Sequence, residues 1–124
     1  MEKKVQVRAR LWLVREGKLM GPGVARLLEG VRRLGSLRRS AAEMQMSYSK
    51  AWSILRQCEA QAGFALTERR VGGAGGGGAQ LTPQGEELLE RYRAFEKEAQ
   101  QTLDQLAQKY FAPQEPESGP EQAR

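Results

Sequence analysis

The sequence contains no histidine, and Cys58 is its single cysteine. Without histidine the commonest general base is missing, so Ser–His, Cys–His and His–Asp catalytic arrangements are excluded. A lone cysteine cannot form an intramolecular disulfide, and the usual ligand set for zinc is incomplete. We therefore expect no metal site, no cofactor and no enzymatic activity.

Long apolar runs are also missing. No stretch approaches the roughly 18 residues that span a bilayer. The N-terminal sequence MEKKVQVRAR alternates charge with valine where a signal peptide would have an apolar block. We therefore expect a cytoplasmic protein with no membrane partner. The length of 124 residues predicts one domain with a modest core.

Charge is divided unevenly along the chain. Residues 1–80 carry fifteen Lys or Arg against six Glu, a net charge of +9, whereas residues 81–124 carry five against nine Asp or Glu, a net charge of −4. A basic first part suits a polyanionic partner such as nucleic acid, and an acidic second part suits water or protein. A merely soluble basic surface explains the same numbers, so charge alone does not decide.

Apolar and polar residues alternate over residues 4–14, KVQVRARLWLV, which predicts a strand with one buried face. The residues expected on that face are Val5, Val7, Ala9, Leu11 and Leu13. A turn at residues 16–17 and a short return strand follow, before the Gly-Pro-Gly of residues 21–23.

Three helices are predicted next. Pro22 suits the first turn of a helix that ends at Gly35, with apolar residues at three- and four-residue steps. Ser36 caps a short second helix, and Ser47 caps a third that ends at Gly63. A short helix, a tight turn and a longer helix inside a basic half are typical of a helix-turn-helix DNA reader. Periodicity alone also allows a small helical bundle.

The glycine-rich stretch RRVGGAGGGGAQLTP, residues 69–83, holds six of the fourteen glycines. Strand-like FALTERRV precedes it and AQLT follows it, which predicts a β-hairpin with its tip at residues 72–78, the wing of a winged helix-turn-helix. Its G-x-G-x-x-G spacing does not indicate a dinucleotide site, because no helix follows directly and no βαβ unit surrounds it. A slack linker remains an alternative.

Thr82 and Pro83 open a last helix expected over residues 83–111. Its apolar stripe recurs at steps of three and four, close to a heptad seam. The members of this stripe are Leu88, Tyr92, Phe95, Ala99, Leu103, Leu106 and Tyr110. The stripe either packs back on the helix that begins at Pro22 or meets a second copy of the chain.

Three segments resemble the N-terminal DNA-binding domain of the ModE-type, molybdate-responsive transcriptional regulators, and more distantly the LysR-type domain. They are LMGPGVARLLEGVRRLGSL, SLRRSAAEMQMSYSKAW and AGFALTERRVGGAGGGGAQLTPQGEELLERY. The resemblance covers residues 5–111, and the combination of S-Y-x-x-A-W with the glycine block and L-T-x-x-G is specific. It implies a DNA-binding function and an antiparallel dimer through the last helix.

Two features depart from that family. Gln45 stands in the turn between the second and third helices where the family commonly has glycine, so the turn either closes without a positive φ or is mildly strained. The oxyanion-binding domains of the full-length regulators do not follow in this sequence, where only APQEPESGPEQAR comes after Phe111. Molybdate sensing is therefore not expected to accompany the resemblance.

Polar and basic residues on the outer faces of the second and third helices and at the wing are the candidate DNA contacts. They are Ser36, Arg38, Arg39, Ser47, Tyr48, Ser49, Lys50, Ser53, Arg56, Arg69 and Arg70. Trp52 is ambiguous between the core and the DNA backbone, and Cys58 is expected in the core.

The predicted fold class is mainly α with a small β component, a winged helix-turn-helix with a long C-terminal dimerisation helix. Residues 1–82 form the DNA-binding domain with its N-terminal strand, residues 83–111 the dimerisation helix through the stripe named above, and residues 112–124 a disordered tail. The predicted function is a homodimeric, sequence-specific transcriptional regulator that binds double-stranded DNA. A winged-helix protein-interaction module or anti-repressor is the alternative.

Overall fold

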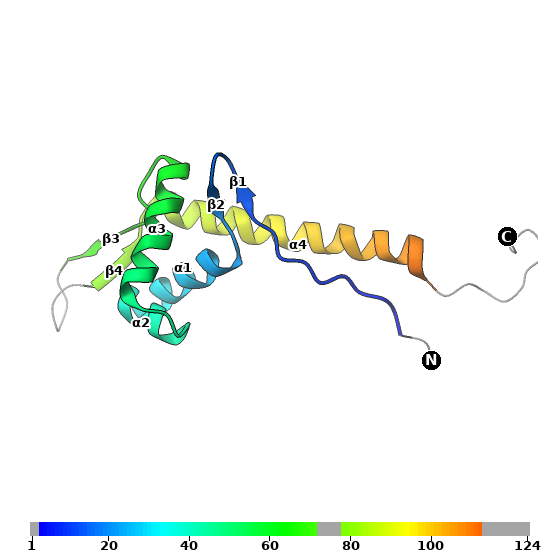
Figure 1. Cartoon of the computed structure of the whole chain (residues 1–124), viewed down its shortest axis with the longest axis horizontal. Helices are drawn as coiled ribbons and strands as arrows, with labels where there is room; N and C mark the ends of the chain where they lie inside the picture. The colour runs from blue at the N-terminus through cyan, green and yellow to red at the C-terminus, as the bar shows by residue number, and fades with distance from the viewer. Residues whose placement is uncertain (1–2, 72–77, 113–124) are drawn as a thin grey trace, which may run out of the picture. The chain divides into compact units, whose positions relative to one another are not determined.

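A computed structural model describes residues 3–71 and 78–112 of the chain. Of the expected hairpin tip, residues 72–77 lie outside the described residues, as does all of the expected tail but Ala112. The chain forms two compact units, one of residues 10–96 and one that joins the N-terminal segment to residues beyond Glu96. The elements are β1 (Leu13–Val14), β2 (Lys18–Met20), α1 (Pro22–Leu34), α2 (Leu37–Glu43), α3 (Tyr48–Ala62), β3 (Thr67–Arg70), β4 (Gly78–Leu81) and α4 (Pro83–Phe111) (Figure 1). The fold is mainly α with a small β component, as expected.

The helix ends agree with the capping residues in the sequence. The hydroxyl oxygens of Ser36 and Ser47 accept hydrogen bonds from the main-chain N–H groups of the third residues of α2 and α3, at 3.1 Å each. Gly35 and Gly63 end α1 and α3 in the left-handed region, with φ of 69° and 85°. The predicted limits of these helices are confirmed.

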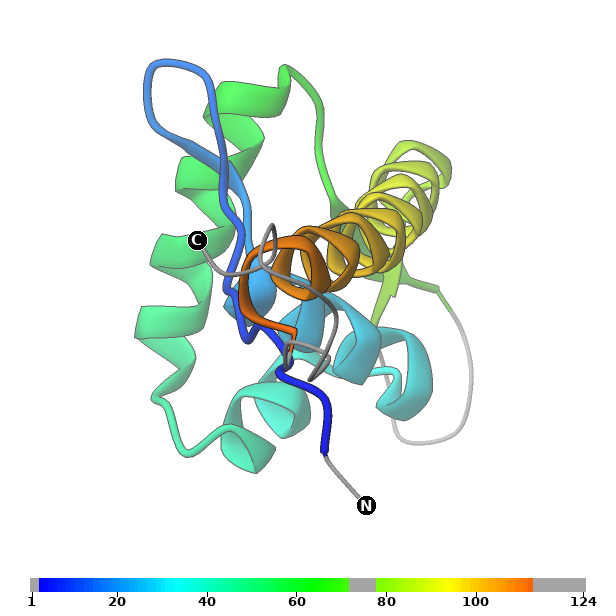
Figure 2. The same cartoon turned by 90° about the vertical axis from the view of Figure 1, so that its right-hand side faces the viewer.

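The core of the 10–96 unit is built on α1. One face of α1 is fully covered, and α2, α3, β2 and the first turns of α4 pack around it. Figure 2 shows α3 rising from the turn that follows α2, so these two helices cross rather than lie side by side. The largest fully buried side chains are Tyr92, Met20, Leu27, Leu28, Leu55, Leu66, Leu89 and Val31.

The strand expected over residues 4–14 is wrong for most of its length. β1 contains only Leu13 and Val14, which pair antiparallel with β2 through Leu13–Met20 and Val14–Lys18. Val5 is 42% exposed and Ala9 is also exposed, so the alternation does not mark a buried face. Strand formation requires a neighbouring strand, and β2 is too short to pair with residues before Leu13.

Side chains of α4 hold the N-terminal segment instead. Within the second unit, the N–H of Val7 donates to Asp104 Oδ1 at 3.0 Å, and Gln100 Nε2 donates to the Val7 carbonyl at 2.7 Å. Gln108 Nε2 donates to the carbonyl of Val5 at 2.8 Å. Polar side chains spaced four residues apart on a helix lie on one face, and this face supplies the partners that a strand would have given.

The start of α4 is as predicted. The Thr82 hydroxyl accepts from the N–H of Gly85 at 2.9 Å and donates to the Ala65 carbonyl at 2.7 Å, so it caps α4 and ties it to the preceding loop. Pro83 occupies the first helical position.

Tyr92 does not belong to a free stripe, which corrects one of the expected dimer residues. Its side chain is 1% exposed, and its hydroxyl donates to the Leu11 carbonyl at 2.7 Å within the 10–96 unit. Leu88 is also partly buried against the core. Ala99 and Leu103 are half-buried, whereas Phe95, Leu106 and Tyr110 are exposed. The first turns of α4 therefore pack on their own domain, and the exposed apolar residues lie farther along the helix.

Candidate nucleic-acid interface

α2 is held rigidly against α1. The Ser40 hydroxyl donates to the Leu27 carbonyl at 2.7 Å, and the contact is so close that a Cβ added at Gly30 would lie 2.0 Å from that hydroxyl oxygen. Leu37 and Ala41 are buried beside it. The exposed side of α2 therefore presents Arg38 and Arg39 to solvent from a fixed base.

The turn between α2 and α3 closes through a positive φ. Gln45 has φ of 58°, in the left-handed region that favours glycine. Hydrogen bonds from the Gln45 N–H to the Ala42 carbonyl and from the Met46 N–H to the Ala41 carbonyl, both 3.0 Å, hold the turn closed. Of the two outcomes expected for this residue, the structure has the strained one.

α3 has one buried and one exposed side. Ala51, Leu55 and Cys58 are buried, which confirms the expected core position of the cysteine. Burial raises the pKa of the Cys58 thiol. The opposite side exposes polar and basic groups, and its members are Tyr48, Ser49, Lys50, Ser53 and Arg56. This side of α3 is the part of the fold that can enter a DNA groove.

The wing is the hairpin of β3 and β4, which pair antiparallel from Thr67–Leu81 to Arg70–Gly78. The N–H of Ala79 donates to the Gly35 carbonyl at 3.0 Å and so attaches the wing to the end of α1. Both wing arginines are exposed, but the Arg70 guanidinium lies against Gly35, where an added Cβ would be 2.7 Å from Arg70 Nη1. Arg69 is therefore the better placed of the two for a ligand.

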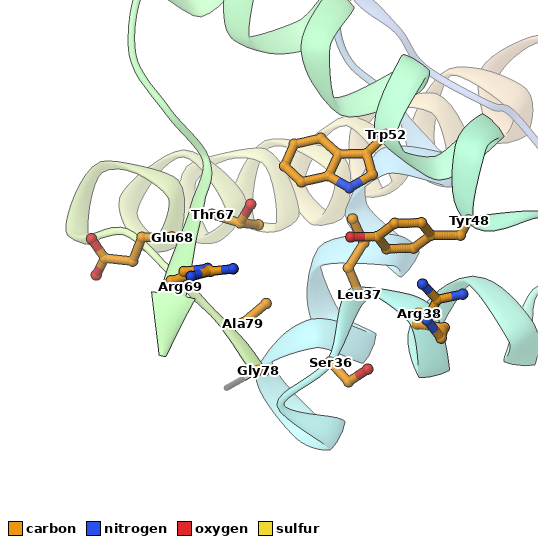
Figure 3. Close-up of a pocket in the computed structure, with 10 residues that line it drawn as sticks. All are labelled: Ser36, Leu37, Arg38, Tyr48, Trp52, Thr67, Glu68, Arg69, Gly78 and Ala79. Carbon is orange, nitrogen blue, oxygen red and sulfur yellow. The ribbon is translucent and has the colours of Figure 1, made fainter. Parts of the chain in front are cut away.

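A hollow of about 430 Å³ separates the wing from the helices. Its walls are the start of α2, the first turns of α3 and both wing strands, as Figure 3 shows. The candidate residues that line it are Ser36, Arg38, Tyr48 and Arg69. The remaining candidates lie outside the lining, on the exposed surfaces of α2, α3 and the wing.

Aromatic and cationic side chains stack along the helix side of this hollow. The Arg38 guanidinium carbon lies 4.2 Å from the centre of the Tyr48 ring, and the Tyr48 and Trp52 rings meet edge to face at 6.3 Å. The Arg56 guanidinium carbon is 5.5 Å from the Trp52 ring. These contacts fix four side chains of α2 and α3 relative to one another.

Trp52, which the sequence left ambiguous, is partly buried. It packs partly against the core, and it also lines the hollow. Thr67 lines the hollow as well and was not among the candidates. The four-residue spacing of Tyr48 and Trp52 is the signal that places both aromatic rings on one side of α3.

Two acidic side chains near the interface have polar or basic partners, and one of them, Glu68, also lines the hollow. Glu43 of α2 pairs with Arg33 of α1, and the hydrogen bond from Arg33 lowers the pKa of the Glu43 carboxyl. Glu68 of the wing accepts a hydrogen bond from Gln80 Nε2 at 3.0 Å. The cations of α2, α3 and the wing therefore dominate the charge of this surface.

Among the residues that the structure describes, no group of three or more His, Cys, Asp or Glu side chains is placed to hold a metal ion. No helix within these residues is long and apolar enough to cross a membrane.

The residues that form this interface match a known protein family. Residues 24–86, from α1 to the first turn of α4, match the family described as bacterial regulatory helix-turn-helix protein, lysR family. Over 84 residues the chain is 40% identical to the molybdenum transport protein ModE of Azotobacter vinelandii and 37% identical to the molybdenum-pterin-binding protein MopB of Rhodobacter capsulatus, in each case 68% of this chain and 31% of the relative. It is 33% identical over 81 residues to the DNA-binding transcriptional dual regulator ModE of Escherichia coli K12, 65% of this chain and 31% of the relative. The chain thus spans less than a third of the length of these relatives. The matched family is one of regulators and not of enzymes.

Proposed function

Because the chain belongs to the lysR family of bacterial regulatory helix-turn-helix proteins, we propose that it is a homodimeric, sequence-specific DNA-binding transcription regulator. The observation that carries the proposal is the exposed side of α3, where serine, lysine and arginine face solvent beside a basic wing. Side chains of these types hydrogen-bond to base edges and phosphates.

The proposed roles of the individual residues follow from their positions on α2, α3 and the wing. Ser49, Ser53 and Arg56 lie on the exposed side of α3 and read base edges in the major groove. Arg69 at the wing, together with Arg38 and Arg39 on α2, neutralises phosphates and sets orientation without reading sequence.

Dimerisation is assigned to the exposed apolar residues of α4. Phe95, Leu106 and Tyr110 are 47%, 48% and 65% exposed, and all three lie on one helical face at steps of eleven and four residues. Exposed large apolar side chains gathered on one face are typical of an interaction surface. Two copies related by a two-fold axis would read two half-sites, so the operator is expected to be an imperfect palindrome.

The alternative, a protein-interaction module, predicts exposed apolar side chains on the outer side of α3. Among the described residues of that helix, Tyr48 is the one large exposed hydrophobic side chain, and it stacks on Arg38. This composition favours DNA over a protein partner.

Binding to duplexes selected from a random library tests the proposal. Affinity is expected to fall steeply with salt, with a log–log slope of about −0.9 for each phosphate neutralised. Arg56→Ala is expected to lower the preference for the selected site by roughly 1–3 kcal/mol. Arg69→Ala is expected to weaken all sequences alike.

Arg91→Ala is the matched control, because Arg91 is an exposed arginine of α4 that pairs with Glu87. It should leave both affinity and preference unchanged. Absence of any complex at low salt would refute DNA binding, and a change of sequence preference in Arg69→Ala but not in Arg56→Ala would show that the reading element is misassigned.

A further inference from the structure

We propose that the hollow between α3 and the wing is a seat for one phosphate of the DNA backbone, formed by Tyr48, Trp52 and Arg69. The inference rests on the proposed function and deepens it. It gives Tyr48, so far only a candidate DNA contact, a role in affinity and not in the reading of bases.

The stacking on Tyr48 fixes where its hydroxyl lies. Arg38 covers one face of the ring at 4.2 Å, and Trp52 meets the ring edge to face. Figure 3 shows the hydroxyl at the end of the ring that points into the hollow, toward the wing and above Leu37. In this orientation the hydroxyl is directed to the hollow and away from the outer side of α3.

Trp52 adds a second donor on the same wall. In Figure 3 its indole nitrogen faces down into the hollow, on the side of the Tyr48 hydroxyl. An indole N–H is a donor only, and a phenol can donate, so two adjacent donors point into one space. A phosphate oxygen is an acceptor that both donors can reach, and hydrogen bonds to a charged acceptor are the stronger ones.

Arg69 approaches from the opposite wall. Figure 3 shows its guanidinium pointing from β3 toward the helices, while the carboxylate of Glu68 points away from them. Glu68 is also occupied by its hydrogen bond with Gln80. The hollow thus receives donors from both sides and a positive charge from Arg69 and from Arg38 beneath the Tyr48 ring.

The shape of the hollow suits a strand that passes through it. Its volume of about 430 Å³ exceeds the needs of one phosphate group, and it lies between the element that enters the major groove and the wing. The floor formed by Leu37 and Ala79 is apolar and can contact a deoxyribose. The surplus volume is therefore assigned to the sugars on either side of the phosphate.

Tyr48→Phe in the full chain tests the seat, because phenylalanine keeps the ring and its stacking and removes only the hydroxyl. Dissociation constants are measured on the selected duplex and on a scrambled duplex of the same length. We expect both to rise by about tenfold, since a hydrogen bond to a charged group is lost, with their ratio unchanged. Trp52→Phe should give the same pattern. Thermal unfolding of both variants is recorded to show that the fold is retained.

Duplexes with a single neutral methylphosphonate linkage locate the phosphate. At one linkage in each half-site, neutralising the phosphate should lower the affinity of the wild type. The affinities of Tyr48→Phe and Arg69→Ala, already lower, should not fall further at that linkage. Equal and additive losses in wild type and variants at every linkage would overturn the seat. So would a changed ratio between the two duplexes for Tyr48→Phe, because the hydroxyl would then contact a base.

A free oxyanion is the other source of the same chemistry, and sodium phosphate is the probe. Trp52 fluorescence is followed in a Trp12→Phe background, which leaves one tryptophan. We expect no saturable change below about 10 mM phosphate. Saturation well below that concentration would assign the hollow to a free oxyanion and overturn the DNA assignment. If the wild type binds no duplex at all, both the proposed function and the phosphate seat are refuted. The outcomes above would refute the seat alone.

Discussion

The hydroxyl of Ser40 in α2 donates a hydrogen bond to the main-chain carbonyl of Leu27 in α1, with 2.7 Å between the two oxygen atoms. Ser40 is 1% exposed, and Gly30 lies directly opposite it. This contact positions the whole helix-turn-helix, because α3 follows α2 after a short turn.

Gly30→Ala is expected to destabilise the domain. The added Cβ would lie 2.0 Å from Ser40 Oγ and 2.8 Å from Ser40 Cβ, so the two helices must separate. Overpacking of this kind costs about 1–3 kcal/mol of unfolding free energy. Gly23→Ala is the matched control, since nothing lies within 4 Å of the added Cβ and α1 should gain about 0.4–1 kcal/mol. Urea unfolding measures both, and equal effects would show that the helix contact is looser than described.

Gln45→Gly is expected to stabilise the protein slightly. The left-handed φ of 58° costs a non-glycine residue roughly 1–2 kcal/mol, and the greater freedom of glycine in the unfolded chain cancels about 0.5–1 kcal/mol of the relief. Gln57→Gly, in the exposed side of α3, should instead cost about 1 kcal/mol. Thermal unfolding of the two variants makes the comparison, and a loss of stability in both would mean that Gln45 carries no strain.

Leu106→Lys is expected to weaken dimerisation without unfolding the chain. Leu106 is 48% exposed, so the substitution removes apolar surface from the proposed interface and adds a charge of the same sign on both copies. Gln101→Lys adds the same charge at an exposed position on a different face of α4 and is the control. Sedimentation equilibrium measures the monomer–dimer constant. A monomeric wild type, or a dimer indifferent to Leu106→Lys, would place the interface elsewhere or remove it.

Tyr92 is expected to make stability depend on pH in the alkaline range. Burial, reinforced by the nearby Glu96 carboxylate, raises the pKa of Tyr92 to about 12 from an ordinary 10. Because the folded state resists loss of this proton, the stabilisation is complete below pH 10 and is lost as pH rises toward 12. Tyr92→Phe should be about 1 kcal/mol less stable than the wild type at pH 7, through loss of the bond to Leu11. The two proteins should then converge above pH 10 in urea unfolding. A constant difference would contradict the raised pKa.

The sequence predicted the helices well because their ends depend on neighbours in the chain. Ser36, Ser47, Gly35 and Gly63 each act within one helical turn, so their identity is enough to place a boundary. The N-terminal strand failed because the partner of Val7 lies 97 residues away and is a helix side chain. Alternation of apolar and polar residues indicates on which face of a strand each side chain would lie, but it does not indicate what will pair with the backbone.

The candidate site was predicted to the level of exposure but not of orientation. Helical spacing places Tyr48 on the outer side of α3, yet the direction of its hydroxyl depends on Arg38, which reaches it from another helix. Periodicity likewise predicted the apolar stripe of α4 but could not separate its buried members from its exposed ones. Tyr92 is buried in the core of its own domain. Packing between elements, which a single sequence does not display, decides both.

Among the described residues of the second unit, the hydrogen bonds from α4 side chains to the N-terminal segment involve main-chain atoms of Val5 and Val7. Gln100, Asp104 and Gln108 therefore recognise a backbone and are indifferent to the side chains it carries. Substitutions that change only the side chains of Val5 and Val7 should therefore leave these hydrogen bonds in place. Proline at position 7 is the exception, since it has no N–H to give to Asp104.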